Sequence, residues 1–116
     1  MIPVIKDKDK DKDKTKNKSG FVYVMKNESS VDNRYKVGMT KRDPSIRAKE
    51  LSTSYADEFI VVYYKRMKDA HKAEKKVFQL LREYMPSAKK EVVDVYDVDM
   101  IKSVIDYVAE TEGVFN

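Results

Sequence analysis

The sequence predicts a small α+β domain, in which a three-stranded sheet of β-β-α-β-α order is flanked by helices and followed by a C-terminal helix. Three observations predict this class. The 116 residues suffice for one domain with one core. Short β-branched and aromatic runs alternate with stretches of helical periodicity. The hydrophobic fraction of 41% is that of a globular protein, although the charged fraction of 38% exceeds the usual value of roughly 25%.

The first half of the domain is predicted as a hairpin and a helix. Residues 20–25 are mostly β-branched and aromatic and predict a strand, and Arg34–Thr40 predicts a second strand antiparallel to it. Asp43 and Pro44 then mark a helix start, with the aspartate as N-cap and the proline at the first helical position. We expect this helix to end near residues 52–55.

The second half is predicted to contain a third strand and a second helix. The run Phe59–Lys65 is almost entirely apolar, so we expect it in the best-buried position of the sheet. Asp69 caps a helix that reaches about Tyr84, where Pro86 stops it. Residues 91–96 fit either a short strand or an extended segment.

The two ends of the chain differ in character. Residues 6–18 alternate Lys with other polar residues and contain no apolar side chain, which predicts a disordered arm over 1–19. Asp97 or Asp99 opens a last helix with apolar residues at 3.6-residue spacing. The expected organisation is therefore an arm (1–19), a domain (20–96) and a C-terminal helix packed on the domain (97–116).

Charge is unevenly distributed along the chain. The formal net charge is +4. Residues 34–49 hold six basic residues against one acid, and residues 65–76 hold six against two. The segment from Asp94 onward holds six acids against one lysine. This layout predicts one electropositive face and an acidic C-terminal segment, with a solvated mixed-charge surface as the alternative.

The composition excludes several kinds of site. The absence of cysteine excludes disulfides, thiolate zinc sites and cysteine nucleophiles, and the single histidine, His71, leaves no imidazole cluster for a metal. No apolar stretch approaches the roughly 20 residues of a membrane span, and residues 1–5 are followed at once by charges, unlike a signal peptide. We therefore expect an intracellular protein without a membrane partner, in the cytoplasm or inside a host cell if it is viral.

Two helical residues stand out because they are polar on a side that should pack. Glu74 falls among the apolar positions of its helix, where a carboxylate is costly unless it is paired or bound to a metal. Arg47 lies four residues before Leu51, at the edge of the sheet-facing side, where its planar fork can meet a phosphate or a carboxylate. The alternatives are an ion pair at the core rim for Glu74 and an ordinary surface arginine for Arg47.

The two strands of the hairpin add a tyrosine and a lysine. Tyr23 shares a strand face with Phe21 and Met25, as a core aromatic also would. Lys36 shares a face with Gly38, and a glycine inside a strand indicates close approach by another backbone or a ligand. A tyrosine, a lysine, an arginine and a glutamate are thus expected on consecutive elements of one small sheet.

These residues resemble those of the GIY-YIG nuclease superfamily. Phe21–Met25 (FVYVM) is similar to the GIY strand, and Tyr35–Thr40 (YKVGMT) is similar to the YIG strand, with Lys36 in the place of the second tyrosine. Residues 34–52 (RYKVGMTKRDPSIRAKELS) resemble the short phage-type DNA-binding branch. The resemblance covers roughly residues 20–95 and implies a GIY-YIG-like fold.

The resemblance also implies a role for each site residue. Tyr23 would act on the attacking water, Lys36 and Arg47 would stabilise charge on the scissile phosphate, and Glu74 would hold one Mg²⁺ or Mn²⁺. DNA is the implied partner. Contacts to its phosphates are expected mainly from the basic side chains around the first helix, which are Lys41, Arg42 and Lys49.

Three functions remain open on the sequence. The first is a metal-dependent endonuclease, a hydrolase of phosphodiester bonds. The second is an inactive DNA-binding module, because Lys36 replaces a tyrosine and Phe78 stands where the branch often has a histidine, while Glu91 resembles the acidic residue that closes the phage-type module. The third is a protein-interaction adaptor that uses the acidic segment 94–112. Specificity would have to come from a homodimer or a partner protein.

Overall fold

The computed structural model of the chain describes residues 18–28, 32–55, 58–85 and 91–112. The predicted arm therefore lies outside the described residues except for Lys18 and Ser19, and Pro86 lies outside them as well. The elements follow in the order β1 (Gly20–Asn27), β2 (Arg34–Thr40), α2 (Pro44–Tyr55), β3 (Phe59–Met67), α3 (Ala70–Leu80), the 3₁₀ helix η1 (Arg82–Tyr84), β4 (Val92–Asp94) and α4 (Val98–Glu110).

Within the described residues, four strands form one antiparallel sheet in the order β3-β1-β2-β4. The predicted hairpin of β1 and β2 is confirmed. The predicted three-stranded sheet is one strand short, because β4 pairs with the first three residues of β2. A three-residue strand is too short to show alternation, so its sequence fits an extended segment equally well. Only pairing with a distant strand decides that it joins the sheet.

The strand in the best-buried position is β1. Residues Val22–Met25 are at most 2% exposed, and β1 pairs with β2 on one side and with β3 on the other. The prediction that Phe59–Lys65 would be the best-buried strand was wrong, because β3 lies at an edge and leaves Ile60 and Tyr64 exposed by 41% and 54%. Helices pack against parts of both faces of β3. Side chains on both faces are therefore partly buried, which explains why the strand is apolar along most of its length.

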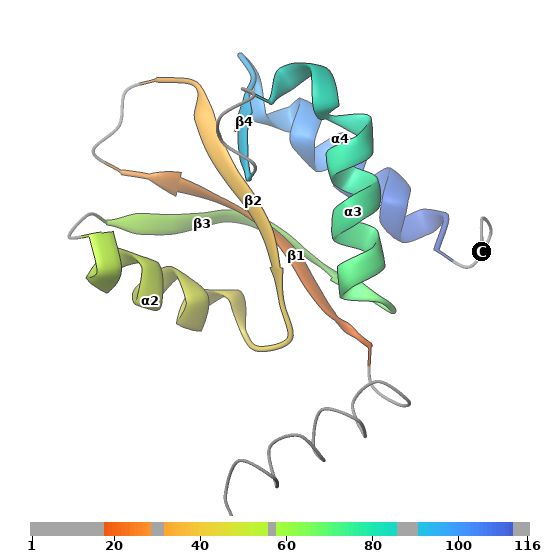
Figure 1. Ribbon diagram of the computed structural model, residues 1–116, viewed down its shortest axis with the longest axis horizontal. Coiled ribbons are helices and arrows are strands. Elements are labelled where there is room, and N and C mark those ends of the chain that lie inside the picture. Colours follow the sequence, from red (N-terminus) through yellow and green to blue (C-terminus); the bar gives the residue numbers. More distant parts are fainter. Residues whose placement is uncertain (1–17, 29–31, 56–57, 86–90, 113–116) are drawn as a thin grey trace, which may run out of the picture.

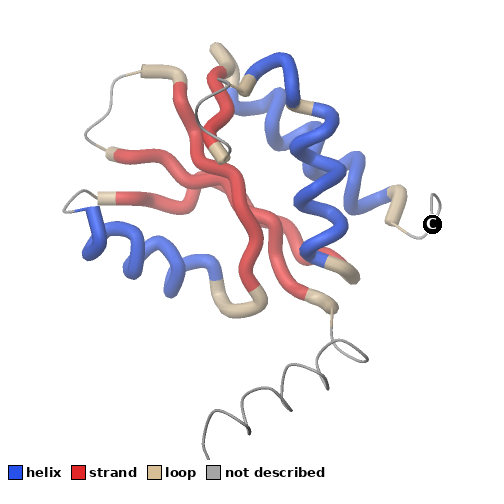
Figure 2. The backbone as a smooth tube through the Cα atoms, in the orientation of Figure 1, coloured by secondary structure: helices blue, strands red, loops and turns tan. Residues whose placement is uncertain are grey.

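The helices cover the two faces of the sheet unequally. One face carries α2, and the other carries α3 and α4 side by side, as Figures 1 and 2 show. The core between the sheet, α3 and α4 contains Val22, Val24, Val37, Met67, Ala73, Val77, Leu81, Val93, Val95, Ile101, Ile105 and Val108. The smaller core under α2 contains Tyr23, Met25, Ala48 and Leu51. Alternation along β1 therefore places its aromatic Tyr23 on the α2 face.

The helices begin where aspartates predict them to begin. Asp43, Asp69 and Asp97 each accept a hydrogen bond from a backbone N–H two or three residues further on, and such bonds satisfy donors that a helix start leaves unpaired. The helix α3 ends at Leu80, earlier than predicted, and η1 continues the chain to Tyr84. Among the helices of the described residues, none has the length and apolar character needed to cross a membrane.

Candidate functional site

Tyr23 lies at the centre of the candidate site. Its side chain belongs to the middle of the sheet, is 2% exposed, and lies opposite Gly38 on the neighbouring strand β2. A Cβ atom at residue 38 would lie 2.5 Å from the Tyr23 hydroxyl oxygen and 2.8 Å from its Cζ atom, so the ring needs a glycine beneath it. This contact explains the close approach predicted at Gly38, and the approaching group is a side chain rather than a backbone or a ligand.

Arg47 of α2 is hydrogen-bonded to Tyr23, with the guanidinium donating to the phenolic oxygen. Burial raises the pKa of Tyr23, and the positive charges of Arg47 and Lys36 only partly offset this effect. The phenol therefore stays protonated at neutral pH. In that state its O–H can donate one hydrogen bond while its oxygen accepts the one from Arg47.

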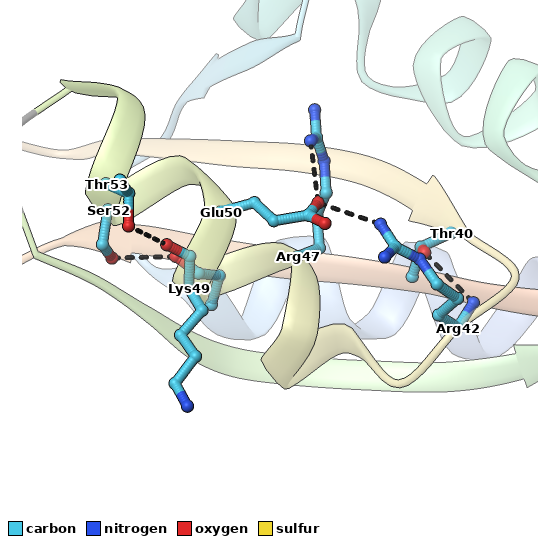
Figure 3. Close-up of polar contacts among 8 residues, drawn as sticks. Thr40, Arg42, Arg47, Lys49, Glu50, Ser52 and Thr53 are labelled. Carbon is cyan, nitrogen blue, oxygen red and sulfur yellow. Dashed lines mark hydrogen bonds and ion pairs between the residues drawn. The ribbon is translucent and has the colours of Figure 1, made fainter.

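Glu50 holds two arginines together and was not predicted as a site residue. Its Oε1 atom accepts a hydrogen bond from Arg42 Nη2 at 2.9 Å and lies 3.4 Å from Arg47 Nη1, so the carboxylate sits between the two guanidinium groups (Figure 3). The hydrogen bond from Arg42 is the main reason that the pKa of Glu50 is lowered. The three-residue spacing from Arg47 to Glu50 was a signal in the sequence. The contact to Arg42 was not, because the chain turns between them.

Lys36 of β2 forms an ion pair with Glu91, to which its Nζ atom donates a hydrogen bond. The backbone supports this pair, because the Val37 amide donates to the Glu91 carbonyl at 2.9 Å. The Lys36 side chain is only 18% exposed, whereas that of Glu91 is 48% exposed. The lysine therefore reaches the surface as part of an ion pair. We include its partner Glu91 among the residues of the candidate site.

Glu74 of α3 is half-buried, on the side of the helix where the sequence places it. Its pKa is raised, first by burial and then by the negative charge of Glu91, while His71 and Lys36 act in the opposite direction. These interactions place Glu74 within electrostatic reach of the pair formed by Lys36 and Glu91. His71 itself is exposed, as expected from its position off the apolar stripe.

The four residues predicted as catalytic are linked pairwise by electrostatic interactions, although each comes from a different element. Tyr23 interacts with Arg47 through a hydrogen bond and with Lys36 through charge. Lys36 in turn interacts through charge with Glu74. The sheet and helices therefore bring a phenol, two cations and a carboxylate from β1, β2, α2 and α3 into one electrostatic cluster.

The three residues predicted to contact phosphates are divided around α2. Arg42 lies beside Arg47 at the Glu50 carboxylate. Lys49 points away from this group, toward the other side of α2, as Figure 3 shows. Lys41 is exposed in the turn between β2 and α2. Arg42 is thus the member of this set that the structure brings directly to the candidate site.

Glu74 and Glu91 are the two carboxylates that interact with Lys36. The described residues contain no group of three or more His, Cys, Asp or Glu able to hold a metal by themselves. Glu74 and Glu91 repel each other, and the raised pKa of Glu74 records this repulsion together with burial. Mg²⁺ is commonly bound through one or two carboxylates, with substrate phosphates and waters as the other ligands. These two carboxylates would leave most ligand positions of such an ion to water and phosphate.

Two hollows of the described surface lie elsewhere. One, of about 390 Å³, lies between α3 and α4, and the other, of about 470 Å³, lies between the end of β3 and the end of α4. Neither is lined by Tyr23, Arg47 or Glu74. The side chains of Arg47 and Glu50 are 40% and 42% exposed, so the part of the candidate site on α2 is an open surface, whereas Tyr23 beside it is buried. An open surface suits a polymer better than a small enclosed ligand.

The comparison with known proteins identifies a family for this chain. The T5orf172 domain family matches residues 20–109, from β1 to the last turn of α4, and so includes every residue of the candidate site. T5orf172 domains are phage-associated and DNA-binding or nuclease-like. No curated protein and no solved structure gives a significant match. Because the match spans most of the chain, the chain belongs to the T5orf172 domain family.

Proposed function

We propose that this domain binds DNA and hydrolyses its phosphodiester bonds as a metal-dependent endonuclease of the GIY-YIG type. The observation that carries the proposal is the hydrogen bond between Tyr23 and Arg47, within electrostatic reach of Lys36. The further charge link from Lys36 to Glu74 adds a carboxylate to the same cluster. The resemblance of both strands to the GIY and YIG segments supports the same reaction class.

Hydrolysis of a phosphodiester needs a positioned water, neutralisation of charge on the phosphate and stabilisation of the leaving oxygen. We assign the orientation of the water to Tyr23, whose hydroxyl lies over Gly38 and interacts with the Arg47 guanidinium. Arg47 has five N–H donors, and the donors not used for Tyr23 and Glu50 bind phosphate oxygens.

Glu74 is the residue that we assign to the metal ion. Glu91 already accepts the hydrogen bond from Lys36, which makes it the poorer ligand of the two carboxylates. When bound, Mg²⁺ or Mn²⁺ supplies positive charge to the phosphate and the leaving oxygen. Lys36, which interacts through charge with Tyr23 and Glu74, adds a second positive charge.

DNA binding would depend mainly on phosphates. Arg42, Lys41 and Lys49 surround the first turns of α2, and contacts of this kind are sequence-independent and weaken strongly with salt. We therefore propose binding to the backbone of the DNA, with little readout of base sequence by this domain.

Nicking of supercoiled plasmid with Mg²⁺ or Mn²⁺ tests the proposed hydrolysis. The variants Arg47→Ala and Glu74→Ala should lose nicking, by about 100-fold or more, because each removes charge stabilisation from the transition state. Glu83→Ala is the matched control, since Glu83 is exposed on η1 and outside the site. Nicking that persists in Glu74→Ala at the wild-type rate would refute the assignment of the metal ligand.

A second candidate function is DNA binding without hydrolysis. Two observations favour it: Lys36 is held in an ion pair with Glu91, and Phe78 packs against the core one turn after Glu74, where the phage-type branch often has a histidine. A gel-shift measurement in EDTA separates the two functions. Salt-sensitive binding together with no nicking in either metal would support the inactive module.

The adaptor function is less well supported by the acidic C-terminal segment. Glu112 accepts hydrogen bonds from the backbone amides of Lys68 and Asp69 at 2.7 and 3.0 Å. Asp106 accepts a hydrogen bond from Tyr63. Two acids of the segment therefore serve contacts within the domain. If the protein shows no salt-sensitive affinity for DNA, the adaptor function is favoured over DNA binding.

A further inference from the structure

The face of the sheet that carries Tyr23 continues beyond α2 onto an exposed aromatic surface. The helix packs against the part of this face near Met25, where Ala48 and Leu51 close the smaller core. Tyr64 of the edge strand β3 lies directly opposite Tyr23 in the register and is 54% exposed. An exposed aromatic side chain is therefore the immediate cross-strand neighbour of the candidate catalytic tyrosine.

A bulge in β3 brings this tyrosine to the Tyr23 face. Val24 pairs with Tyr63, but the next residue of β1, Met25, pairs with Val61, so Val62 is one residue more than the partner strand has. Alternation is therefore interrupted, and β3 presents a valine to the α2 core before the bulge and a tyrosine to the open surface after it. Bulges are enriched next to active sites, where they redirect side chains in this way.

Phe21 and Arg66 extend the aromatic surface. They lie opposite each other on β1 and β3, one alternation step beyond the pair of Tyr23 and Tyr64. The rings of Phe21 and Tyr64 meet edge to face, with centroids 5.7 Å apart and planes at 84°. The guanidinium carbon of Arg66 lies 5.6 Å from the centroid of the Phe21 ring. Two aromatic rings and a guanidinium thus form one continuous patch, which we call the Phe21–Tyr64–Arg66 patch.

The charge around this patch favours a polyanion. Neither β1 nor β3 contains an aspartate or a glutamate. The nearest acid on α2, Glu50, is held between Arg42 and Arg47. Aromatic rings beside arginines are the features that bind single-stranded nucleic acid, because bases stack on the rings while phosphates meet the cations.

We propose that the Phe21–Tyr64–Arg66 patch is a stacking site for an unpaired nucleobase of the strand whose phosphate lies at Arg47. The inference rests on the proposed function, since it takes the Tyr23–Arg47 pair as the place of the phosphate. Tyr64 is the cross-strand partner of Tyr23, and opposite residues on neighbouring strands have Cβ atoms about 5 Å apart, so the patch begins at the position next to Tyr23 on the same face of the sheet. The substrate class is therefore DNA with unpaired bases, such as a single strand, a gap or a flap, because the bases of an intact duplex are already stacked.

Affinities for a single-stranded oligonucleotide and for a duplex of the same length test this inference. They are measured by fluorescence anisotropy in EDTA, so that no cleavage is needed. Tyr64→Ala should bind the single strand about 5- to 150-fold more weakly, which is the loss expected from one stacked base. Tyr64→Phe should retain wild-type affinity, because it keeps the ring. Tyr107→Ala is the matched control, since Tyr107 is 48% exposed on α4, and it should bind like the wild type.

A second variant separates stacking from folding. Tyr64→Leu keeps an apolar side chain on β3 but removes the ring, so its thermal stability should stay close to that of the wild type while its single-strand affinity falls. A fluorescent base analogue in the strand should be quenched by the wild-type protein and not by Tyr64→Leu, because quenching requires contact with the ring.

The outcomes for the patch and for the proposed function are distinguishable. Wild-type single-strand affinity in both Tyr64→Ala and Tyr64→Leu, with duplex binding intact, would overturn the stacking site and leave DNA binding in place. A wild-type protein that binds neither oligonucleotide would overturn both. A loss of affinity that is equal for the single strand and the duplex would also overturn the stacking site, because stacking on an unpaired base must favour the single strand.

Discussion

Tyr23 and Gly38 lie opposite each other on β1 and β2, and the Tyr23 ring occupies the space in which any other residue at position 38 would place its Cβ atom. The hydroxyl of the same ring accepts the hydrogen bond from Arg47. Gly38 is therefore needed for the position of the Tyr23 ring in the candidate site as well as for the packing of the sheet. It allows the tyrosine to lie against β2 and to reach the arginine of α2.

Gly38→Ala should destabilise the domain and disturb the tyrosine. The added methyl group would stand 2.5 Å from the phenolic oxygen, so the ring must move, at a cost of about 1–3 kcal/mol in the free energy of unfolding. Urea denaturation measures this cost. Combination with Tyr23→Phe removes the nearest atom, so the double variant should lose less stability than the two single variants together. Strict additivity would contradict the contact.

Glu74→Gln should stabilise the domain at neutral pH. The folded-state pKa of Glu74 is raised above the ordinary 4.5, which means that folding favours the protonated carboxyl. The protein therefore has its full stability below pH 4.5, where the carboxyl is protonated in both states. It loses part of that stability as the pH rises through the folded-state pKa and the buried carboxyl must ionise. A neutral glutamine avoids this loss, so Glu74→Gln should be more stable than the wild type at neutral pH. Urea denaturation at neutral pH and at a pH below the glutamate range should show the gain only at the former. A Glu74→Gln protein less stable than the wild type at neutral pH would contradict the burial and repulsion described for this carboxylate.

Tyr63 should titrate far into the alkaline range. Its hydrogen bond to Asp106 raises its pKa to about 12. Because this value exceeds the ordinary 10.0, the associated stability is complete below pH 10 and is lost as the pH rises toward 12. Ultraviolet titration of tyrosinate should show a phenol that titrates near pH 12 and is absent in Tyr63→Phe. In Asp106→Asn the late phenol should move down, and an unchanged titration in that variant would contradict the assigned cause.

Glu50→Gln should strengthen DNA binding if Arg42 and Arg47 bind the phosphates of the DNA. The wild-type carboxylate accepts from Arg42 and lies beside Arg47, so it competes with a phosphate for both guanidinium groups. In Glu50→Gln, affinity should rise several-fold, and the slope of log affinity against log salt should steepen by about one unit for each added phosphate contact. Glu110→Gln, at an exposed position of α4, is the control. Weaker binding by Glu50→Gln would instead make Glu50 a residue that positions the arginines.

The local elements could be predicted because their signals are local. Asp43, Asp69 and Asp97 mark the helix starts through bonds that span only two or three residues. Alternation in β1 separates Tyr23 from its neighbours Val22 and Val24, which belong to the opposite core. Helix caps and strand alternation depend only on neighbouring residues, whatever the rest of the fold. The sequence is therefore sufficient to predict them.

The order of the strands could not be predicted in the same way. An apolar run such as Phe59–Lys65 fits a central strand and an edge strand with partly covered faces equally well. The pairing of Val92–Asp94 with β2 joins segments more than fifty residues apart in the chain. Both features depend on which surfaces the helices cover after folding, and no property of the separate segments contains that information.

By itself, the sequence determined the hairpin, the helix starts, the half-buried position of Glu74 and the four residues that resemble a nuclease site. Only the tertiary structure decided that Glu50 bridges Arg42 and Arg47, that Glu91 pairs with Lys36, and that a bulge turns Tyr64 to the Tyr23 face. The physical reason is the range of the interactions. Caps and alternation act between near neighbours, whereas ion pairs and register shifts form between segments that meet only when the sheet and α2 pack together.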